Sequence, residues 1–336
     1  MEPSDVETGK DLYSHRHPAS TRDNPTAVTC ITGMHRSGTS LVARLLHECG
    51  MALGPERELK KPAADNLDGY FENRKFVRLN ENIITQFGGR WNHPPSFPPG
   101  WELTPEASQF LEPAKNLVSQ FRHDNWGWKD PRTSLTLPFW RRLIPDLKVV
   151  VCIRNPIEVS RSLFLRGDTK SPSHFELWLA YYSQLLSATS PSNRLVTHYQ
   201  SYFKDARAEL RRVLNWLDVD VSDETVERAC THISADLRHH YVMTAESIGT
   251  NVPDEILSSY LDLCAEAGPI YQQARQHEAS NGAALAVGRA NELSAVLKEL
   301  QHTRASGETR RQLLNEILNS KAFKLVSLYW RLRRRK

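Results

Sequence analysis

Apolar runs typical of buried strands alternate with amphipathic segments along most of the chain. The runs 27–31, 147–153 and 194–198 are β-prone, and the second is almost continuously apolar, like a central parallel strand covered on both faces. A shorter strand is predicted over 125–128. Helical spacing of apolar residues predicts helices over 41–49, 75–86, 133–144, from 156 onward and over 205–217. This alternation predicts an α/β fold with a doubly wound parallel sheet flanked by helices.

The two ends of the chain depart from this pattern. Residues 1–25 are polar and show no periodicity, which predicts a disordered lead-in. In residues 277–336 apolar positions recur at helical spacing around a polar interruption, which predicts a helical C-terminal extension with a basic tail. The main domain is therefore expected to span 26–276.

Charge is unevenly distributed between the body and this tail. The chain has a net charge of +4, yet residues 321–336 contain seven Lys or Arg residues and no acidic residue. The rest is slightly acidic, which argues against nucleic-acid binding by the main domain. The tail combines basic and aromatic residues, so it either contacts an anionic membrane surface or a partner, or is simply a solvated helix end.

The cysteine pattern and the absence of targeting segments predict a cytoplasmic protein. Five cysteines are scattered without metal-ligand spacing, as expected of buried, reduced thiols. The polar N-terminus has no secretory h-region, and no run of 18 apolar residues occurs. Peripheral membrane association through the tail is compatible with this prediction.

The loop between the first strand and the first helix carries the strongest chemical signal. Gly33 and Gly38 have the spacing of a phosphate-binding P-loop, and unpaired N–H groups at a helix N-terminus bind anions. Thr39 stands where a nucleoside triphosphatase has its lysine, and Arg36 lies inside the loop. The loop therefore predicts a site for a phosphate-like group rather than ATP hydrolysis.

Basic residues also follow two other predicted strands. Arg154 stands where a nucleoside triphosphatase would place an acidic magnesium ligand, and Ser162 follows eight residues later. Arg154 either takes a second phosphate or forms a salt bridge at the strand end. Lys129 is placed to neutralise charge on a bridging oxygen, while Asp130 either accepts a proton or caps the following helix.

Together these segments resemble the sulfotransferase superfamily, which uses 3′-phosphoadenosine-5′-phosphosulfate (PAPS). The family's 5′-phosphosulfate loop is matched by Arg36, Ser37, Gly38, Thr39 and Ser40. Its 3′-phosphate site is matched by Arg154 and Ser162, and its tyrosine near the adenine by Tyr199. The acidic residues usual after that tyrosine are replaced by Gln200 and Ser201, and the basic-glycine loop that closes the cofactor site is not recognisable. The motifs HRSGTS, DNLDGYFEN, GWKDPR and RNP resemble a bacterial group of sulfotransferases over about residues 27–220.

The resemblance implies sulfuryl transfer from PAPS to an acceptor hydroxyl, on a carbohydrate or glycolipid, without a metal. We expect the N–H groups of residues 37–40 on the 5′-phosphate and Arg36 and Lys129 near the scissile bond. Bacterial trehalose-type members have a glutamate after the first helix in an aromatic setting, which favours Glu72 as general base, with Asp130 second. Glu72 is alternatively a helix N-terminal carboxylate.

The sequence also leaves two other functions open, a kinase and a non-catalytic protein, and it contains a group of tryptophans with two alternative roles. A small-molecule or nucleotide kinase would need a lysine at position 39 and an acidic magnesium ligand, and a non-catalytic protein of the same fold would act through its C-terminal helices. Five tryptophans are candidates for a sugar-binding platform, or else pack in the core. They are Trp91, Trp101, Trp126, Trp128 and Trp140.

Overall fold

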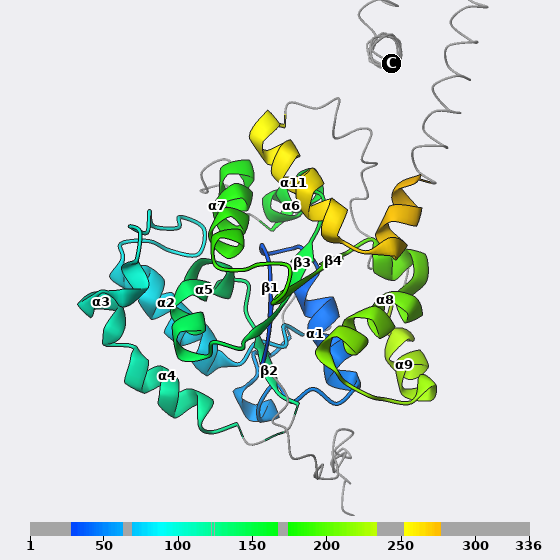
Figure 1. The fold of residues 1–336 in the computed structure, drawn as a ribbon, viewed down its shortest axis with the longest axis horizontal. Helices are drawn as coiled ribbons and strands as arrows, with labels where there is room; N and C mark the ends of the chain where they lie inside the picture. The colour runs from blue at the N-terminus through cyan, green and yellow to red at the C-terminus, as the bar shows by residue number, and fades with distance from the viewer. Residues whose placement is uncertain are drawn as a thin grey trace, which may run out of the picture.

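A parallel sheet forms the centre of the structure, a computed structural model that describes residues 28–62, 69–121, 123, 125–166, 174–233 and 252–276. Its strands in the described chain are β1 (Thr29–Thr32), β2 (Gly127–Lys129), β3 (Lys148–Ile153) and β4 (Arg194–His198). They lie in the order β2-β1-β3-β4, and all neighbours are parallel (Figure 1). The predicted α/β fold with a parallel sheet is confirmed.

Helices cover both faces of this sheet (Figure 1). On one face lie α2 (Arg74–Gln86), α5 (Thr133–Leu143), α7 (His174–Ser187) and α11 (Asp254–Glu266). On the other lie α1 (Thr39–Glu48), α8 (Ser201–Leu217) and α9 (Asp223–Cys230). In β3, Val149 and Val151 pack into the first core and Val150 and Cys152 into the second. Burial on both faces explains the continuous apolar run of this strand.

Smaller helices complete the described chain. They are η1 (Glu56–Glu58), η2 (Trp101–Leu103), α3 (Pro105–Ser108), α4 (Leu111–Val118) and α6 (Pro156–Leu165). Asn155 caps α6 by accepting a hydrogen bond from Ile157 N–H at 2.9 Å, and Pro156 occupies the first helical position, as the sequence predicts.

Strand order places the ends of β1 and β3 side by side. After β1 the chain runs through α1 and later forms β2, which pairs with one edge of β1. Strand β3 pairs with the opposite edge of β1. In this register Thr32, the last residue of β1, lies opposite Val151. Such a reversal of strand order is where α/β sheets bind ligands, outside the carboxyl ends of the strands.

Two predicted element boundaries need correction. Helix α8 begins at Ser201, four residues before the predicted start, but Asp205 has non-helical torsion angles within it. The Asp205 carboxylate accepts a hydrogen bond from Ala208 N–H at 3.0 Å, so the predicted start is a local cap inside a longer, kinked helix. Strand β2 covers Gly127–Lys129 rather than 125–128, because Trp126 forms only an isolated bridge to Ala52.

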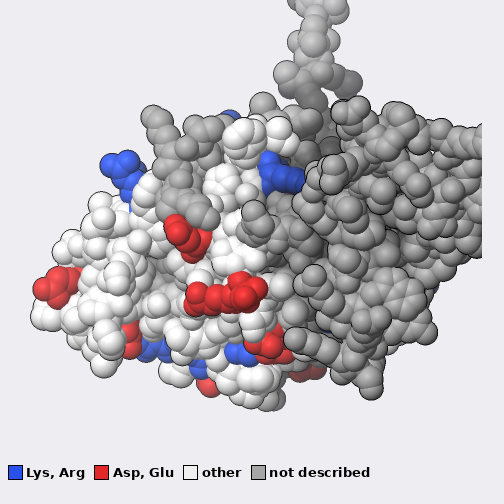
Figure 2. All heavy atoms as spheres, turned by 90° about the horizontal axis from the view of Figure 1, so that it is seen from above, with Lys and Arg blue, Asp and Glu red and all other residues white. Residues whose placement is uncertain are grey.

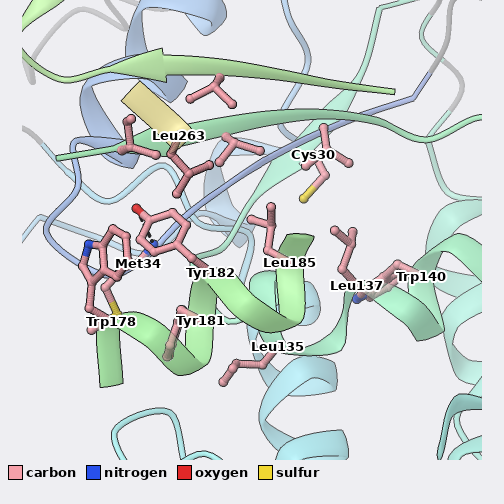
Figure 3. Close-up of a cluster of buried hydrophobic side chains, with 14 of the residues drawn as sticks. Cys30, Met34, Leu135, Leu137, Trp140, Trp178, Tyr181, Tyr182, Leu185 and Leu263 are labelled. Atoms are coloured by element: carbon pink, nitrogen blue, oxygen red, sulfur yellow. Dashed lines mark hydrogen bonds between the residues drawn. The ribbon is translucent and has the colours of Figure 1, made fainter. Parts of the chain in front are cut away.

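Of the two alternatives for the five tryptophans, core packing is confirmed for four. Trp101, Trp126, Trp128 and Trp140 are buried in the larger apolar core, where Phe76 stacks on Trp128 with ring centroids 4.7 Å apart. Figure 3 shows part of this core, with Trp140 beside Leu137. These side chains pack against apolar neighbours because buried aromatic area is worth more there than on the surface. Trp91 alone of the five is partly exposed.

Several other expectations concern composition and surface. The five cysteines are free, and four of them are buried. Among the described residues no helix is long and apolar enough to cross a membrane, and no cluster of three or more His, Cys, Asp or Glu could hold a metal ion. On the face shown in Figure 2, the described acidic residues lie in short groups and the basic ones are scattered. The predicted lead-in, helical extension and basic tail lie outside the described residues.

Candidate active site

The loop after β1 presents the N-terminus of α1. Gly38 lies in the left-handed region with φ 89° and precedes Thr39, the first helical residue. The first helical hydrogen bond runs from Val42 N–H to the Gly38 carbonyl oxygen at 3.1 Å, so the amides just before Val42 form the N-terminal end of the helix. The N–H of Ser37 donates to the Met34 carbonyl oxygen at 3.1 Å.

Buried polar contacts hold this loop in shape. The Tyr182 hydroxyl donates to the Cys152 carbonyl oxygen at 2.8 Å, accepts from Met34 N–H at 3.3 Å and lies 3.1 Å from Ser37 Oγ. Figure 3 shows Tyr182 on α7 reaching toward Met34. A Cβ atom on Gly33 would lie 2.2 Å from the same Cys152 oxygen, so only glycine allows this approach. Tyr182 was not a sequence-predicted site residue.

The two predicted phosphate-binding segments meet. Arg36 Nε donates to Ser162 Oγ at 2.8 Å, which joins the loop after β1 to helix α6. Arg154 Nη1 lies 3.4 Å from the Arg36 carbonyl oxygen. Arg36 is 118 residues from Arg154 and 126 residues from Ser162 in the sequence. The fold, not the local sequence, therefore brings these residues together.

Tyr199 joins the same cluster from the end of β4. Its N–H donates to the Ile153 carbonyl oxygen at 2.9 Å, and the Arg154 guanidinium lies over its ring at 4.3 Å. A Cβ atom on Gly38 would lie 2.5 Å from a ring carbon of Tyr199. The predicted nucleotide-binding residues are therefore neighbours in the structure.

Glu158, which was not among the predicted residues, orients Arg154. Arg154 Nε donates to Glu158 Oε2 at 2.6 Å, and both side chains are buried. Glu158 lies in the first turn of α6, where a carboxylate is favoured by the helix dipole. The spacing of four residues between the two was a visible signal for an ion pair. Arg154 therefore does form the salt bridge that the sequence left open as one of two alternatives. The same ion pair also fixes the direction in which the other N–H donors of the guanidinium point.

A buried ion pair links the loop to Glu72. Lys129 Nζ lies 2.7 Å from Glu72 Oε1 and donates to Ser40 Oγ at 3.1 Å. Glu72 and Lys129 are only 3% and 2% exposed. Burial alone would raise the pKa of Glu72, but the charges of Lys129 and Arg132 outweigh it and hold that pKa below its usual value.

The second carboxylate oxygen of Glu72 is differently placed. Lys60 Nζ lies 3.7 Å and Arg132 Nη1 4.0 Å from Oε2, and no described residue donates a hydrogen bond to this atom. Glu72 precedes the Asn73 cap of α2 and is thus outside the helix. Its carboxylate is therefore not in the first turn of α2, and it pairs with Lys129.

Asp130 lies just before α5, two residues ahead of the N-cap residue Arg132. It is fully buried, and its Oδ1 accepts hydrogen bonds from Arg132 N–H and Arg132 Nη1, each at 3.0 Å. Its Oδ2 accepts from Asn80 Nδ2 at 2.8 Å. Both oxygens are therefore engaged in buried contacts just before α5. The N-cap residue of α5 is Arg132 and has no side-chain capping hydrogen bond, so Asp130 does not perform the capping role that the sequence left open.

The fold and the loop define an α/β protein with a phosphate-binding loop after its first strand. The model of the Sulfotransferase family matches residues 29–223, more than half of the chain, so the protein belongs to the sulfotransferase family. This confirms the resemblance to PAPS-dependent sulfotransferases and the prediction of an enzyme, and it decides against the kinase alternative. A comparison with curated proteins gives no match.

Solved structures of sulfotransferases are similar to this chain at low sequence identity. A sulfotransferase from Mycobacterium avium is 16% identical, with 71% of this chain and 77% of that one covered and a TM-score of 0.43. The sulfotransferase domain of the Synechococcus PCC 7002 olefin synthase is 17% identical, with coverage of 79% and 98% and a TM-score of 0.41. A sulfotransferase from Mycobacterium tuberculosis H37Rv is 15% identical, with coverage of 70% and 77% and a TM-score of 0.39.

Proposed function

We propose that this enzyme transfers the sulfuryl group of PAPS to a hydroxyl of a carbohydrate or glycolipid, by in-line displacement without a metal. The observation that carries the proposal is the convergence of Arg36, Arg154 and Ser162 beside the N-terminus of α1. Lys129 connects this cluster to Glu72 through Ser40. A cationic site for a bisphosphorylated nucleotide thus adjoins a buried carboxylate.

The donor fits the charges of this cluster. PAPS supplies an activated sulfuryl group on a phosphate leaving group. The amides at the start of α1, with Thr39 and Ser40, bind its 5′-phosphosulfate end. Arg154 and Ser162 bind the 3′-phosphate, because an oriented guanidinium matches phosphate geometry. Tyr199 packs near the adenine.

The acceptor hydroxyl needs a base, and Glu72 is the best-placed candidate. Lys129 holds Oε1, so Oε2 is positioned to accept the hydroxyl proton while the acceptor oxygen forms its bond to sulfur. The bond from sulfur to the phosphate oxygen breaks, and Arg36 and Lys129 stabilise the charge left on that oxygen. Cationic side chains suffice for this stabilisation, so the proposed reaction needs no metal. Asp130 remains the second candidate base, although both its oxygens are engaged.

Binding of the product nucleotide tests the donor site. Arg36→Ala and Arg154→Ala should each weaken the affinity for 3′,5′-bisphosphoadenosine in titration calorimetry. A charge-assisted hydrogen bond is worth about 1.5–3 kcal/mol, which corresponds to roughly 10–150-fold in Kd. Arg78→Ala, a change of the same charge at an exposed position of α2, should leave Kd unchanged.

Unchanged affinity in both site variants would refute the donor site. Transfer of radiolabel from PAPS to a panel of carbohydrates and lipids then tests the acceptor class, and activity with ATP and Mg²⁺ but not with PAPS would refute the reaction itself.

A further inference from the structure

One oxygen of the proposed base and two further buried polar atoms have no hydrogen-bond partner in the described structure. Among the described residues such side-chain atoms are Glu72 Oε2, Arg132 Nε, His35 Nε2, Trp101 Nε1, Trp178 Nε1 and Ser201 Oγ. The first three come from separate segments, the stretch before α2, the start of α5 and the loop after β1. Leaving a buried polar atom unsatisfied costs about 1–3 kcal/mol, so native proteins keep few of them and a concentration at one place indicates a ligand.

The segments that carry these groups lie against one another. Thr32 Oγ1, at the end of β1 before the loop with His35, donates to the Asp130 carbonyl oxygen at 2.9 Å, two residues before Arg132. Arg132 Nη1 lies 4.0 Å from Glu72 Oε2. Burial lowers the pKa of His35 well below its usual value, and the charges of Arg132 and Lys129 lower it further. His35 is 8% exposed and is therefore a neutral imidazole at physiological pH.

Aromatic side chains surround the imidazole. The His35 ring lies 4.6 Å from the Trp91 ring and, nearly edge-on, 5.7 Å from the Tyr181 ring. The Tyr181 hydroxyl donates to the Trp91 carbonyl oxygen at 2.8 Å, which fixes the segment that carries Trp91. Burial raises the pKa of Tyr181, so its hydroxyl is protonated and available as this donor.

We propose that His35, Arg132 and Trp91 form the acceptor subsite and that the acceptor binds through at least two hydroxyl groups. This inference rests on the proposed function. One hydroxyl is the reacting group at Glu72 Oε2, and a second lies at His35 Nε2 and Arg132 Nε. The Trp91 ring packs against the apolar face of the acceptor ring.

The hydrogen-bonding chemistry of the three atoms selects a polyol. A carboxylate oxygen only accepts, a guanidinium nitrogen only donates, and the nitrogen of a neutral imidazole does one or the other according to its tautomer. A hydroxyl group both donates and accepts, so two hydroxyls on one ring satisfy all three atoms. A phenol with a single hydroxyl would satisfy Glu72 and leave His35 and Arg132 without partners.

The experiment measures transfer of radiolabelled sulfuryl from PAPS to polyols and to a monohydroxyl probe. Trehalose, methyl β-glucopyranoside and myo-inositol represent the polyols, and 2-naphthol represents the phenols. The wild-type enzyme should sulfate at least one polyol with a higher kcat/KM than 2-naphthol. His35→Leu should raise KM for that polyol by about tenfold or more, the loss expected for one buried hydrogen bond, with a much smaller change in kcat.

Two further variants separate this role from a structural one. His35→Gln, whose amide both donates and accepts, should recover part of the affinity, and Trp91→Ala should raise KM where Trp91→Phe largely preserves it. His93→Leu, at an exposed position, is the matched control and should match the wild type. The affinity of each variant for 3′,5′-bisphosphoadenosine should stay within about twofold of wild type, because neither His35 nor Trp91 is among the residues proposed to bind the nucleotide.

The outcomes separate this inference from the function on which it rests. If the wild-type enzyme did not bind 3′,5′-bisphosphoadenosine, the proposed function would be refuted. If nucleotide binding is intact, an unchanged polyol KM in His35→Leu would overturn the acceptor subsite alone. A preference for 2-naphthol, or transfer to none of the polyols, would overturn the subsite and the carbohydrate acceptor while leaving the PAPS donor site in place.

Discussion

At the scale of the residue, the carboxylate of Glu72 combines a fixed position with an available oxygen. Lys129 holds Oε1 at 2.7 Å, while Oε2 has no hydrogen-bond donor among the described residues. The nearby cations keep the pKa of Glu72 low, so the group is ionised at neutral pH. A base of low pKa is a weak one, but its charge is always present and its orientation is set before the acceptor arrives.

Removing the charge of Glu72 should stop catalysis without abolishing donor binding. For Glu72→Gln we expect kcat to fall by about 10²–10⁴-fold, the usual contribution of a positioned base. The amide keeps the shape of the side chain, so the affinity for 3′,5′-bisphosphoadenosine should change little. Steady-state kinetics and calorimetry on the same preparation measure both quantities.

Glu106→Gln, an exposed change on α3, controls for the loss of a carboxylate. The assignment would be wrong if Glu72→Gln retained near-normal turnover while Asp130→Asn lost it. Asp130→Asn should instead lower thermal stability, because the fully buried carboxylate accepts hydrogen bonds from Arg132 and Asn80.

The pH dependence of catalysis should report the Glu72–Lys129 pair. The acid limb of kcat/KM falls as pH drops through the pKa of the base in the free enzyme. Because the pKa of Glu72 is lowered, this limb should lie below the usual glutamate value of about 4.3. Lys129→Met removes the cation that contributes most to the lowering, so its acid limb should move to higher pH.

A pH–rate profile of each enzyme, with folding monitored by circular dichroism at every pH, gives the comparison. Lys75→Met, which removes a cation from the surface of α2, should leave the limb in place. An acid limb that does not move in Lys129→Met would show that Glu72 is not the titrating base.

Residue chemistry was predictable where the sequence itself carries a spacing. Arg154 and Ser162 stand eight residues apart around a helix start, and Arg36 lies within a glycine-bounded loop. Glu158 and His35 were missed for different reasons. Glu158 looks like an ordinary first-turn carboxylate, and nothing in the sequence indicates that His35 is buried without a partner, since this depends on segments remote in the chain.

At the scale of the element, the turn into α1 depends on the backbone of Gly38. Its φ of 89° is unfavourable for any residue with a Cβ, and that atom would lie 2.5 Å from the Tyr199 ring. Gly38→Ala should therefore strain the backbone and also push the Tyr199 ring out of its position. We expect it to weaken binding of 3′,5′-bisphosphoadenosine and to lower the free energy of unfolding, as measured by calorimetry and urea denaturation.

Gly88 supplies the matched comparison. It has a similar φ of 82°, but a Cβ there would meet no atom within 4 Å. Gly88→Ala should cost only the backbone strain of about 1–2 kcal/mol and leave nucleotide affinity intact. Equal effects of the two substitutions on nucleotide affinity would contradict the proposed contact between the loop and Tyr199.

Elements were predictable where their periodicity is clear. The apolar run of β3 and the spacing in α1 identify both elements because each buries a fixed face. Helix α7 was not assigned, although it carries Tyr182 behind the loop. Its stretch from Trp178 to Tyr182 is rich in aromatic residues, which favour strands as much as helices, and tertiary packing decides between them.

At the scale of the whole molecule, strand order creates the site. Neighbouring β1 and β3 bring together Arg36 and Ser162, which are 126 residues apart. The sequence predicts a parallel sheet but does not encode the order β2-β1-β3-β4 in any local signal. The grouping of these residues therefore rested on the family resemblance, and the contacts among them are what the structure adds.

A nucleotide bound across this junction should stabilise the entire fold. It would join the loop after β1 to the end of β3 and to α6, and so bind only when all three are in place. At 100 times Kd, 3′,5′-bisphosphoadenosine should add about 2.7 kcal/mol to the free energy of unfolding. At about 2–4 °C per kcal/mol for a domain of this size, Tm should rise by about 5–10 °C in differential scanning calorimetry.

The comparison of ligands and variants makes this increase specific. Adenosine 5′-monophosphate lacks the group that Arg154 and Ser162 are proposed to bind, so at equal concentration it should raise Tm less. In Arg154→Ala the difference between the two nucleotides should largely disappear, because the 3′-phosphate loses its guanidinium, whereas Arg78→Ala should retain it. If the difference in Tm increase between the two nucleotides persisted in Arg154→Ala, the 3′-phosphate would have to bind elsewhere. If both nucleotides stabilised the wild-type enzyme equally, the end of β3 would not take part in binding.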